Sequence, residues 1–293
     1  MDQVTKECNN KLRQRKVKIG YWNLQPVKVQ VLTYADDVVL LSDSEENLQI
    51  IVTTWAEQLK LKNMETNVAK CKVLHVTKKK KEDSIPPNIK IGTNAFEVVD
   101  QFKYLGTIFS RNGKIEQEIK NRITQATRTY YQINKTIINK KEVSKKTKMQ
   151  IYQTIYLPTL LYGCETWPRA ATTDSQIQAA EMKYLRRVAN KTRFDRERNS
   201  KIREEVGVIP AMDMVEEKQL KWYGHVKRMG PERITRRVVE AREWEKRSRG
   251  RPRKTWLNNI EDYGRKRGKS MAEMDTLTKN RKEWIRLAEA ARR

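Results

Sequence analysis

Apolar residues follow two different periods along this chain, and these periods predict where its strands and helices lie. Short apolar runs at 29–33 and 38–41 are rich in β-branched residues and lack helical spacing, which is typical of two strands joined by a turn. Residues 45–61 instead repeat apolar positions at helical spacing. The sequence therefore predicts a hairpin followed by a helix.

The same reading extends along the rest of the chain. Segments 89–91 and 96–109 read as paired strands around a Gly-Thr-Asn turn, whereas residues 114–161 place apolar side chains three and four positions apart. Beyond residue 172 the pattern is again helical, and its tryptophans are interpreted as core residues rather than base-stacking platforms. Residues 1–28 show only weak patterning, so we expect little regular structure there.

The turn of the first hairpin carries two adjacent carboxylates, in the sequence Tyr34-Ala35-Asp36-Asp37. Unpaired charges flanked by apolar strands are costly unless a cation meets them. Magnesium prefers hard oxygen ligands and takes one or two carboxylates together with water and phosphate. The alternative is an acidic hairpin turn without a metal, because aspartate is a common turn former.

Several further segments occur in the order of one known family. Together with the tetrapeptide at 34–37, they resemble the reverse transcriptase of a non-LTR (LINE-type) retrotransposon, from about residue 17 to 265. One departure is Cys71, which stands where threonine is usual. The matching segments are Asn67-Val68-Ala69-Lys70-Cys71-Lys72, Phe102-Lys103-Tyr104-Leu105-Gly106, and the stretches 161–167, 222–226 and 249–256.

This resemblance implies an α+β fold made of a partial polymerase palm, a helical thumb and a basic, mostly α-helical tail. Residues 1–28 would be a truncated N-terminal segment, and 29–110 the second half of the palm with a hairpin that grips the primer. Residues 111–171 would form the thumb-like region and 172–293 the basic C-terminal region.

The resemblance also implies a reaction and its residues. In the intact enzyme Asp36 and Asp37 would hold Mg²⁺ (or Mn²⁺), and a primer 3′-hydroxyl would attack a dNTP on an RNA template. Lys70 would approach the leaving pyrophosphate, with Lys72 as its substitute; both are otherwise ordinary strand-edge lysines. The implied nucleotide-binding and primer-binding residues are Tyr34, Ala35, Phe102, Tyr104, Leu105 and Gly106.

A third catalytic aspartate, expected before Tyr34, is missing from these 293 residues. Only Asp2 and Glu7 are acidic in that stretch, and neither lies in an apolar run. We therefore expect the isolated chain to be inactive as a polymerase, since it also lacks the fingers and any endonuclease domain. Two alternatives stay open: a non-enzymatic nucleic-acid-binding protein derived from a retroelement, and a decayed element without a stable product.

Charge points to a nucleic-acid partner independently of the motifs. The formal net charge is +26 and the pI is about 10.0, which favours binding to phosphate backbones over solubility alone as the explanation. The run at 249–253 reads either as the core of an AT-hook or as a rigid basic linker, and it or the cluster at 78–81 would suit a nuclear localisation signal. The candidate phosphate contacts are Lys140, Lys141, Lys145, Lys146, Lys148, Arg249, Arg251, Arg253 and Lys254.

Other function classes fit the composition poorly. No apolar stretch approaches the roughly 20 residues of a membrane span, and the first 25 residues lack the apolar core of a signal peptide, so we expect an intracellular protein of the nucleus or cytoplasm. Three scattered cysteines are too few for a disulfide framework. With only His75 and His225 as histidines, no cluster has the spacing of zinc ligands.

Overall fold

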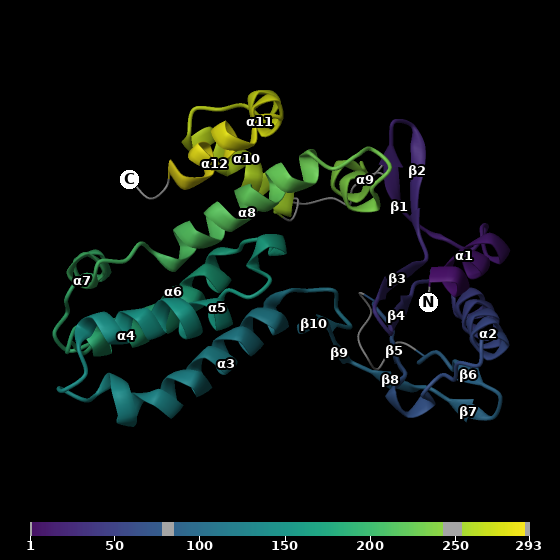
Figure 1. Ribbon diagram of the computed structural model, residues 1–293, viewed down its shortest axis with the longest axis horizontal. Helices are drawn as coiled ribbons and strands as arrows, with labels where there is room; N and C mark the ends of the chain where they lie inside the picture. The colour runs from purple at the N-terminus through teal and green to yellow at the C-terminus, as the bar shows by residue number, and fades with distance from the viewer. Residues whose placement is uncertain (1, 78–84, 243–253, 291–293) are drawn as a thin grey trace. The chain divides into compact units, whose positions relative to one another are not determined.

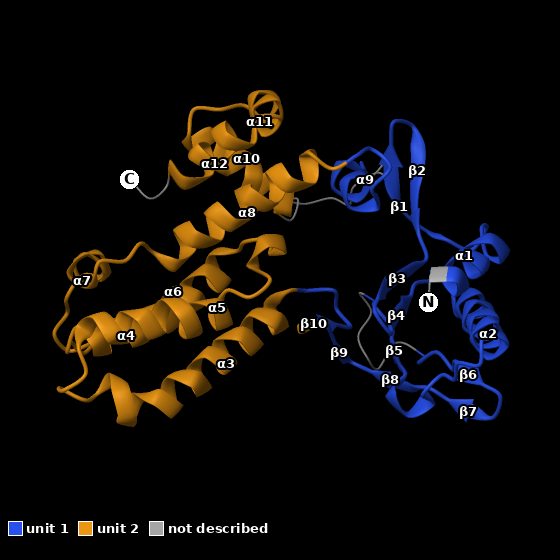
Figure 2. Ribbon diagram, viewed as in Figure 1, with its two compact units in different colours: residues 1–104, 109–114, 230–249 blue, residues 105–108, 115–229, 250–293 orange. Residues whose placement is uncertain are grey.

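The computed structural model describes residues 2–77, 85–242 and 254–290, which form two compact units. Unit 1 contains residues 1–104, 109–114 and 230–249, and unit 2 contains residues 105–108, 115–229 and 250–293 (Figure 2). Unit 1 mixes helices with short strands, whereas unit 2 is largely helical (Figure 1). The mixed helix and strand content predicted from the sequence is therefore confirmed.

Unit 1 begins with a helix where the sequence predicted little structure. Helix α1 (Asp2–Lys11) buries Val4, Cys8 and Leu12 against Ile51 and Trp55 of helix α2 (Glu45–Leu61). Strands β1 (Val17–Trp22) and β2 (Gln25–Val29) follow and pair antiparallel. The prediction of a weakly structured segment at 1–28 was wrong. Val4, Cys8 and Leu12 form an apolar stripe at i, i+4 and i+8 that packs on α2, about 40 residues later in the chain.

The next hairpin and helix follow the sequence prediction closely. Strand β3 (Val31–Tyr34) pairs antiparallel with β4 (Asp37–Leu40), within a residue or two of the predicted runs. Helix α2 has the predicted bounds, and its N-terminus is capped by the Ser44 hydroxyl, which accepts a hydrogen bond from the Asn47 amide at 3.2 Å.

The later strands of unit 1 are shorter and more divided than predicted. Strand β5 (Lys72–Leu74) pairs parallel with β8 (Glu97–Val99), while β6 (Lys90–Ile91) and β7 (Asn94–Ala95) form a small hairpin. The predicted strand at 96–109 is broken into β8, β9 (Gln101–Tyr104) and β10 (Thr107–Ser110), and the last two pair with each other. The basic cluster at 78–81 lies outside the described residues.

A segment from the second half of the chain also belongs to unit 1. Helix α9 (Ile234–Glu240) lies beside β1, where the Trp22 indole nitrogen donates a 2.8 Å hydrogen bond to Glu240. Tyr21 and Arg242 exchange two backbone hydrogen bonds of 3.0 and 2.8 Å. Part of the predicted basic tail therefore contributes to the N-terminal unit.

Unit 2 is built on a large helical core. Its helices are α3 (Glu116–Ile133), α4 (Lys145–Ile151), α5 (Leu157–Leu160), α6 (Ala171–Val188), α7 (Asn199–Val206) and α8 (Ala211–Lys227), with π turns at Asn134–Ile138 and Tyr152–Tyr156. The rings of Tyr152, Tyr156 and Tyr184 meet at its centre, with centroids 4.8 to 5.9 Å apart. The helical pattern predicted for 114–161 is confirmed.

A second cluster forms where three C-terminal helices pack on α8. They are α10 (Trp256–Lys266), α11 (Met271–Thr278) and α12 (Arg281–Glu289). The Trp284 indole donates a 2.8 Å hydrogen bond to the Leu220 carbonyl, and a Cβ at Gly224 would collide with the indole nitrogen. Of the tryptophans interpreted as core residues, Trp256 is half-buried and packs against this cluster, Trp222 is half-buried, and Trp244 lies outside the described residues.

Candidate functional site

The two candidate catalytic carboxylates lie at the tip of the β3–β4 hairpin. Tyr34 is paired with Asp37, so Ala35 and Asp36 form the turn, and Ala35 takes a left-handed conformation with φ 53°. Such a backbone costs an ordinary L-residue about 1 kcal/mol or more. Asp36 and Asp37 are both exposed, as are Tyr34 and Ala35. The hairpin therefore presents two carboxylates and a phenol ring to solvent at one point.

Metal-binding capacity at this tip depends on how many oxygen ligands converge. Asp36 and Asp37 supply the hard oxygen donors that magnesium prefers, and water completes such a shell in many sites. Within the described ranges, no three Asp, Glu, His or Cys side chains cluster as potential metal ligands. Glu7 is held in an ion pair with Lys62 at 3.7 Å. The aspartate pair thus fits part of a metal site.

The predicted primer-gripping segment begins on β9. The pKa of the Tyr104 phenol is raised, first by burial and then by the negative charge of Asp37. Phe102 and Tyr104 are half-buried on alternate positions of β9, while Leu105 and Gly106 follow in left-handed conformations with φ of 47° and 84°. Within unit 1, Tyr104 therefore lies within electrostatic range of Asp37.

The two lysines proposed for the leaving group differ in their surroundings. Lys70 is exposed at the end of the short 3-10 turn Val68–Lys70, and the Asn67 side chain accepts a 3.3 Å hydrogen bond from its amide. Lys72, the substitute, is in an ion pair with Glu97 of the neighbouring strand. Lys70 is thus the more accessible lysine, and Asn67 has a local role in shaping the segment.

Unit 2 holds the tip of the β9–β10 hairpin through residues that the sequence did not single out for this purpose. Tyr162 donates a 3.0 Å hydrogen bond to the Leu105 carbonyl, and Arg122 donates to the Gly106 carbonyl. The Arg122 guanidinium also lies 4.4 Å from the centre of the Tyr162 ring. Residues 105–108 belong to unit 2, so these contacts form one local cluster.

A buried carboxylate completes the cluster. Glu118 is fully buried, accepts a 2.7 Å hydrogen bond from the Ile108 amide and forms an ion pair with Arg122. The i, i+4 spacing of Glu118 and Arg122 was visible in the sequence. It pointed only to an ordinary surface helix pair, because the partner backbone at 106–108 cannot be read from spacing.

The candidate phosphate contacts are placed unevenly. Lys140, Lys141 and Lys146 are exposed, whereas Lys145 is paired with Glu205 at 2.8 Å. Lys148 is only 6% exposed and its ammonium donates a 2.8 Å hydrogen bond to the Lys140 carbonyl. A phosphate contact by Lys148 is thus incompatible with this structure, since its charge is directed into unit 2.

The remaining candidates follow α9. Lys254 forms an ion pair with Asp262 at 2.6 Å. Arg249, Arg251 and Arg253, and with them the AT-hook interpretation, lie outside the described residues. Among the helices that the structure describes, none is long and apolar enough to cross a bilayer.

Comparison with known proteins supports the resemblance. Residues 1–109 match the family model described as reverse transcriptase (RNA-dependent DNA polymerase). The chain is 25% identical over 266 residues to a transposon-derived protein of Caenorhabditis elegans, which covers 87% of this chain and 93% of that relative. It is 27% identical over 179 residues to the RNA-directed DNA polymerase from mobile element jockey of Drosophila melanogaster, covering 58% of this chain but only 19% of the polymerase.

The predicted resemblance to non-LTR retrotransposon reverse transcriptases is therefore confirmed. The family match ends at residue 109, so it includes the aspartate hairpin and nearly all of the predicted half-palm. Because this chain covers only 19% of the jockey polymerase, the match does not assign the activity and partners of that longer protein to these 293 residues.

Proposed function

We propose that this chain is the C-terminal portion of a retrotransposon RNA-directed DNA polymerase, with the second half of a palm at 29–110, a thumb-like region at 111–171 and a basic helical region at 172–293. One observation carries the proposal: within the stretch that matches reverse transcriptases, β3 and β4 expose Asp36 and Asp37 at a hairpin tip. The capped helix α2 follows directly.

In the intact enzyme these side chains would hold Mg²⁺ or Mn²⁺, which supplies charge stabilisation to the attacking and leaving oxygens of phosphoryl transfer. Asp36 and Asp37 would supply its carboxylate ligands. Tyr104, whose phenol is influenced by the charge of Asp37, would help to position the primer end, and exposed Lys70 would neutralise charge on the leaving pyrophosphate. RNA template, DNA primer and dNTP are the implied partners.

These 293 residues alone are proposed to be inactive in nucleotidyl transfer. Two adjacent carboxylates on one turn provide only part of the oxygen shell that fixes a metal pair, and ligand number and geometry decide how firmly such ions are held. Among the described residues, no third carboxylate, histidine or cysteine joins the pair to complete that shell.

A primer-extension assay tests this directly. The purified chain is incubated with an RNA template, a DNA primer, dNTPs and Mg²⁺ or Mn²⁺, beside Asp36→Ala and Asp37→Ala variants. No extension is expected from any of the three proteins. Extension by the unmodified chain that disappears in Asp36→Ala would refute the proposed inactivity while supporting the assigned catalytic residue.

The second candidate function is non-enzymatic nucleic-acid binding. A net charge of +26 favours it, because so large an excess of cations attracts polyanions whether or not the aspartates act. Salt-dependent binding that Asp36→Ala leaves unchanged, in a chain without polymerase activity, would favour this function. Binding that requires Asp36 and a divalent metal would instead tie affinity to the polymerase site.

A further inference from the structure

A cavity of about 630 Å³ opens on unit 2 beside α6, and its lining is strongly basic. Among the described residues that line it, none is an aspartate or glutamate. It therefore gathers positive charge on a concave surface of an already basic protein. The basic side chains in its wall are Lys183, Arg186, Arg187, Lys191 and Arg193.

Three of these five cations, called here the α6 basic cluster, are held by neutral partners. Arg186 donates a 2.7 Å hydrogen bond to the Asn199 side chain, and Lys183 donates one of 2.9 Å to the Tyr131 hydroxyl. Lys183 also lies 4.3 Å from the centre of the Tyr131 ring. Arg187 donates to the Asn139 side chain. Such contacts orient the cations without neutralising them.

Other cations of unit 2 form ion pairs with carboxylates. Arg169 is paired with Asp174 at 2.8 Å, Arg203 with Glu181 at 2.6 Å and Lys145 with Glu205 at 2.8 Å. None of the α6 basic cluster is in an ion pair with a carboxylate of the described chain. Lys191 is within electrostatic range of the Asp195 and Glu205 carboxylates, which offset part of the charge of the cluster. The remaining like charges repel one another, so this surface favours an anionic ligand.

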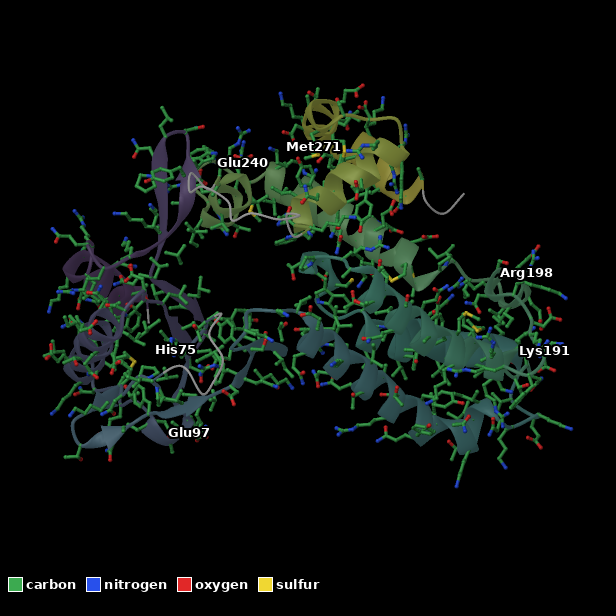
Figure 3. All side chains as sticks on the ribbon, turned by 180° about the vertical axis from the view of Figure 1, so that it is seen from behind. His75, Glu97, Lys191, Arg198, Glu240 and Met271 are labelled. Carbon is green, nitrogen blue, oxygen red and sulfur yellow. The ribbon has the colours of Figure 1, made fainter. Side chains whose placement is uncertain are left out.

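The loop that continues from α6 adds an aromatic ring to this charged surface. Phe194 follows Arg193 and is 96% exposed. The loop is held by Asp195, whose carboxylate accepts hydrogen bonds from the Thr192 amide at 2.5 Å and the Thr192 hydroxyl at 2.8 Å. Figure 3 shows Lys191 and Arg198, which bound this loop, at the same end of unit 2. An apolar ring is thus presented to water directly after Thr192 and Arg193, two residues that line the cavity.

We propose that the α6 basic cluster and Phe194 form a binding site for single-stranded nucleic acid, in which the cations contact phosphates and the Phe194 ring stacks on an unpaired base. A positively charged groove combined with an exposed aromatic side chain is how proteins hold single strands without reading their sequence. A duplex would keep its bases stacked internally and leave Phe194 without a partner. The inference rests on the proposed nucleic-acid-binding function and assigns it a site.

The test measures binding of the full 293-residue chain to fluorescent oligonucleotides by anisotropy over a range of salt. The probes are a single-stranded oligo(dT) of about 12 nucleotides, an oligo(rU) of the same length, an abasic strand with the same phosphates, and a duplex. The variants are Phe194→Ala, Phe194→Trp and the double variant Arg187→Gln/Arg193→Gln. Arg281→Gln/Lys282→Gln on α12 removes the same charge from exposed positions and serves as the control.

Phe194→Ala is expected to weaken oligo(dT) and oligo(rU) binding about tenfold, since stacking on one base contributes roughly 1 to 3 kcal/mol. It should leave abasic-strand binding unchanged, and Phe194→Trp should restore affinity. The Arg187→Gln/Arg193→Gln variant should lower the slope of log affinity against log salt by about 1.4, because each single-strand phosphate contact contributes about 0.7. The α12 control should change that slope much less.

Several results would overturn the proposal. Equal losses for the α6 and α12 double variants would show that only total charge matters. If Arg187→Gln/Arg193→Gln weakens the affinity for duplex and for single strand equally, and Phe194→Ala changes neither affinity, the single-strand assignment is refuted. If the unmodified chain binds no probe even at low salt, the proposed nucleic-acid-binding function fails together with the site. If the unmodified chain binds the probes and the α6 and Phe194 variants bind them equally well, the site alone is refuted. Circular dichroism of each variant checks that the helices are retained.

Discussion

The hydroxyl of Tyr162 donates a 3.0 Å hydrogen bond to the carbonyl oxygen of Leu105. Each residue comes from a segment by which the sequence resembles reverse transcriptases, and 57 positions separate them. The bond holds the tip of the β9–β10 hairpin, where Gly106 takes a φ of 84°. Two motifs that look independent in the sequence are therefore parts of one structural unit.

Tyr162→Phe is expected to loosen this tip without unfolding unit 2. The substitution removes one hydrogen bond, which contributes about 1 kcal/mol or less here because Tyr162 is half-exposed and water replaces part of the interaction. Hydrogen exchange should therefore speed up at the Ile108 amide while amides of α6 keep their protection. Unchanged exchange at Ile108 would show that Arg122 and Glu118 hold the tip without Tyr162.

Gly106→Ala should destabilise the same hairpin more strongly. A left-handed residue with a Cβ costs roughly 1 to 2 kcal/mol, and this Cβ would lie 3.3 Å from the Tyr162 ring and hydroxyl. Gly207→Ala is the matched control, since its φ is 69° but nothing lies within 4 Å of an added Cβ. Urea unfolding of both variants should show the larger loss for Gly106→Ala; equal losses would mean that the Tyr162 contact adds nothing.

Arg203→Met is expected to be among the most damaging single changes in unit 2. Glu181 is fully buried, and it accepts hydrogen bonds from Arg203 at 2.6 Å and from the Ala211 amide at 2.8 Å. Removing the cation leaves a buried carboxylate without its counter-charge, which costs about 3 to 5 kcal/mol. Thermal unfolding followed by circular dichroism measures the loss.

The double variant Glu181→Gln/Arg203→Met is the control for that interpretation. It removes the stranded charge together with its partner, so it should recover part of the lost stability. A double variant less stable than Arg203→Met alone would mean that packing of the Arg203 side chain, rather than charge pairing, supports the core.

Local patterns predicted the parts of this fold whose causes lie close together in the chain. Helix α2 was predicted with its observed bounds because its apolar spacing and its Ser44 cap are both local. The aspartate hairpin was predicted because β-branched runs flank a turn. The electrostatic influence of Asp37 on Tyr104, 67 positions later, is something no local pattern could have shown.

The features missed by the sequence depend on distant partners. Helix α1 was missed because its apolar stripe is buried only by packing on helix α2. The stripe is formed by Val4, Cys8 and Leu12, and it packs against Ile51 and Trp55. Lys148 looked like one more surface lysine until its ammonium was found on the Lys140 carbonyl inside unit 2. The α6 basic cluster was missed because a cavity is not a property of spacing. Charge composition predicts the kind of partner, but not where it binds.

Thiol reactivity should distinguish the three cysteines. Burial raises the pKa of the Cys8 thiol to about 11 and that of Cys164 to about 12, while Cys71 is half-exposed with a pKa that burial also raises. Only thiolates react, and only where reagent reaches them. At pH 8 we expect Ellman's reagent to titrate Cys71 in the folded chain and all three after unfolding. Loss of the fast phase in Cys71→Ser would confirm the assignment.

The pH dependence of stability should carry a contribution from Asp213, on the first turn of α8. Burial, followed by repulsion from Glu216, raises the pKa of the Asp213 carboxyl above its ordinary value of 3.8. A folded-state pKa above the unfolded value means that the folded chain binds more protons than the unfolded chain at pH values between the two. This group therefore contributes stability at low pH that is lost as pH rises through its folded pKa.

Asp213→Asn, which keeps the shape without the charge, should therefore raise the melting temperature at pH 7. The gain should shrink as the pH falls toward 4, where Asp213 is itself becoming protonated. Melting curves of both proteins across this range test the sign, and a gain that grows toward pH 4 would show that the charged carboxylate stabilises α8 through its helix N-terminus instead.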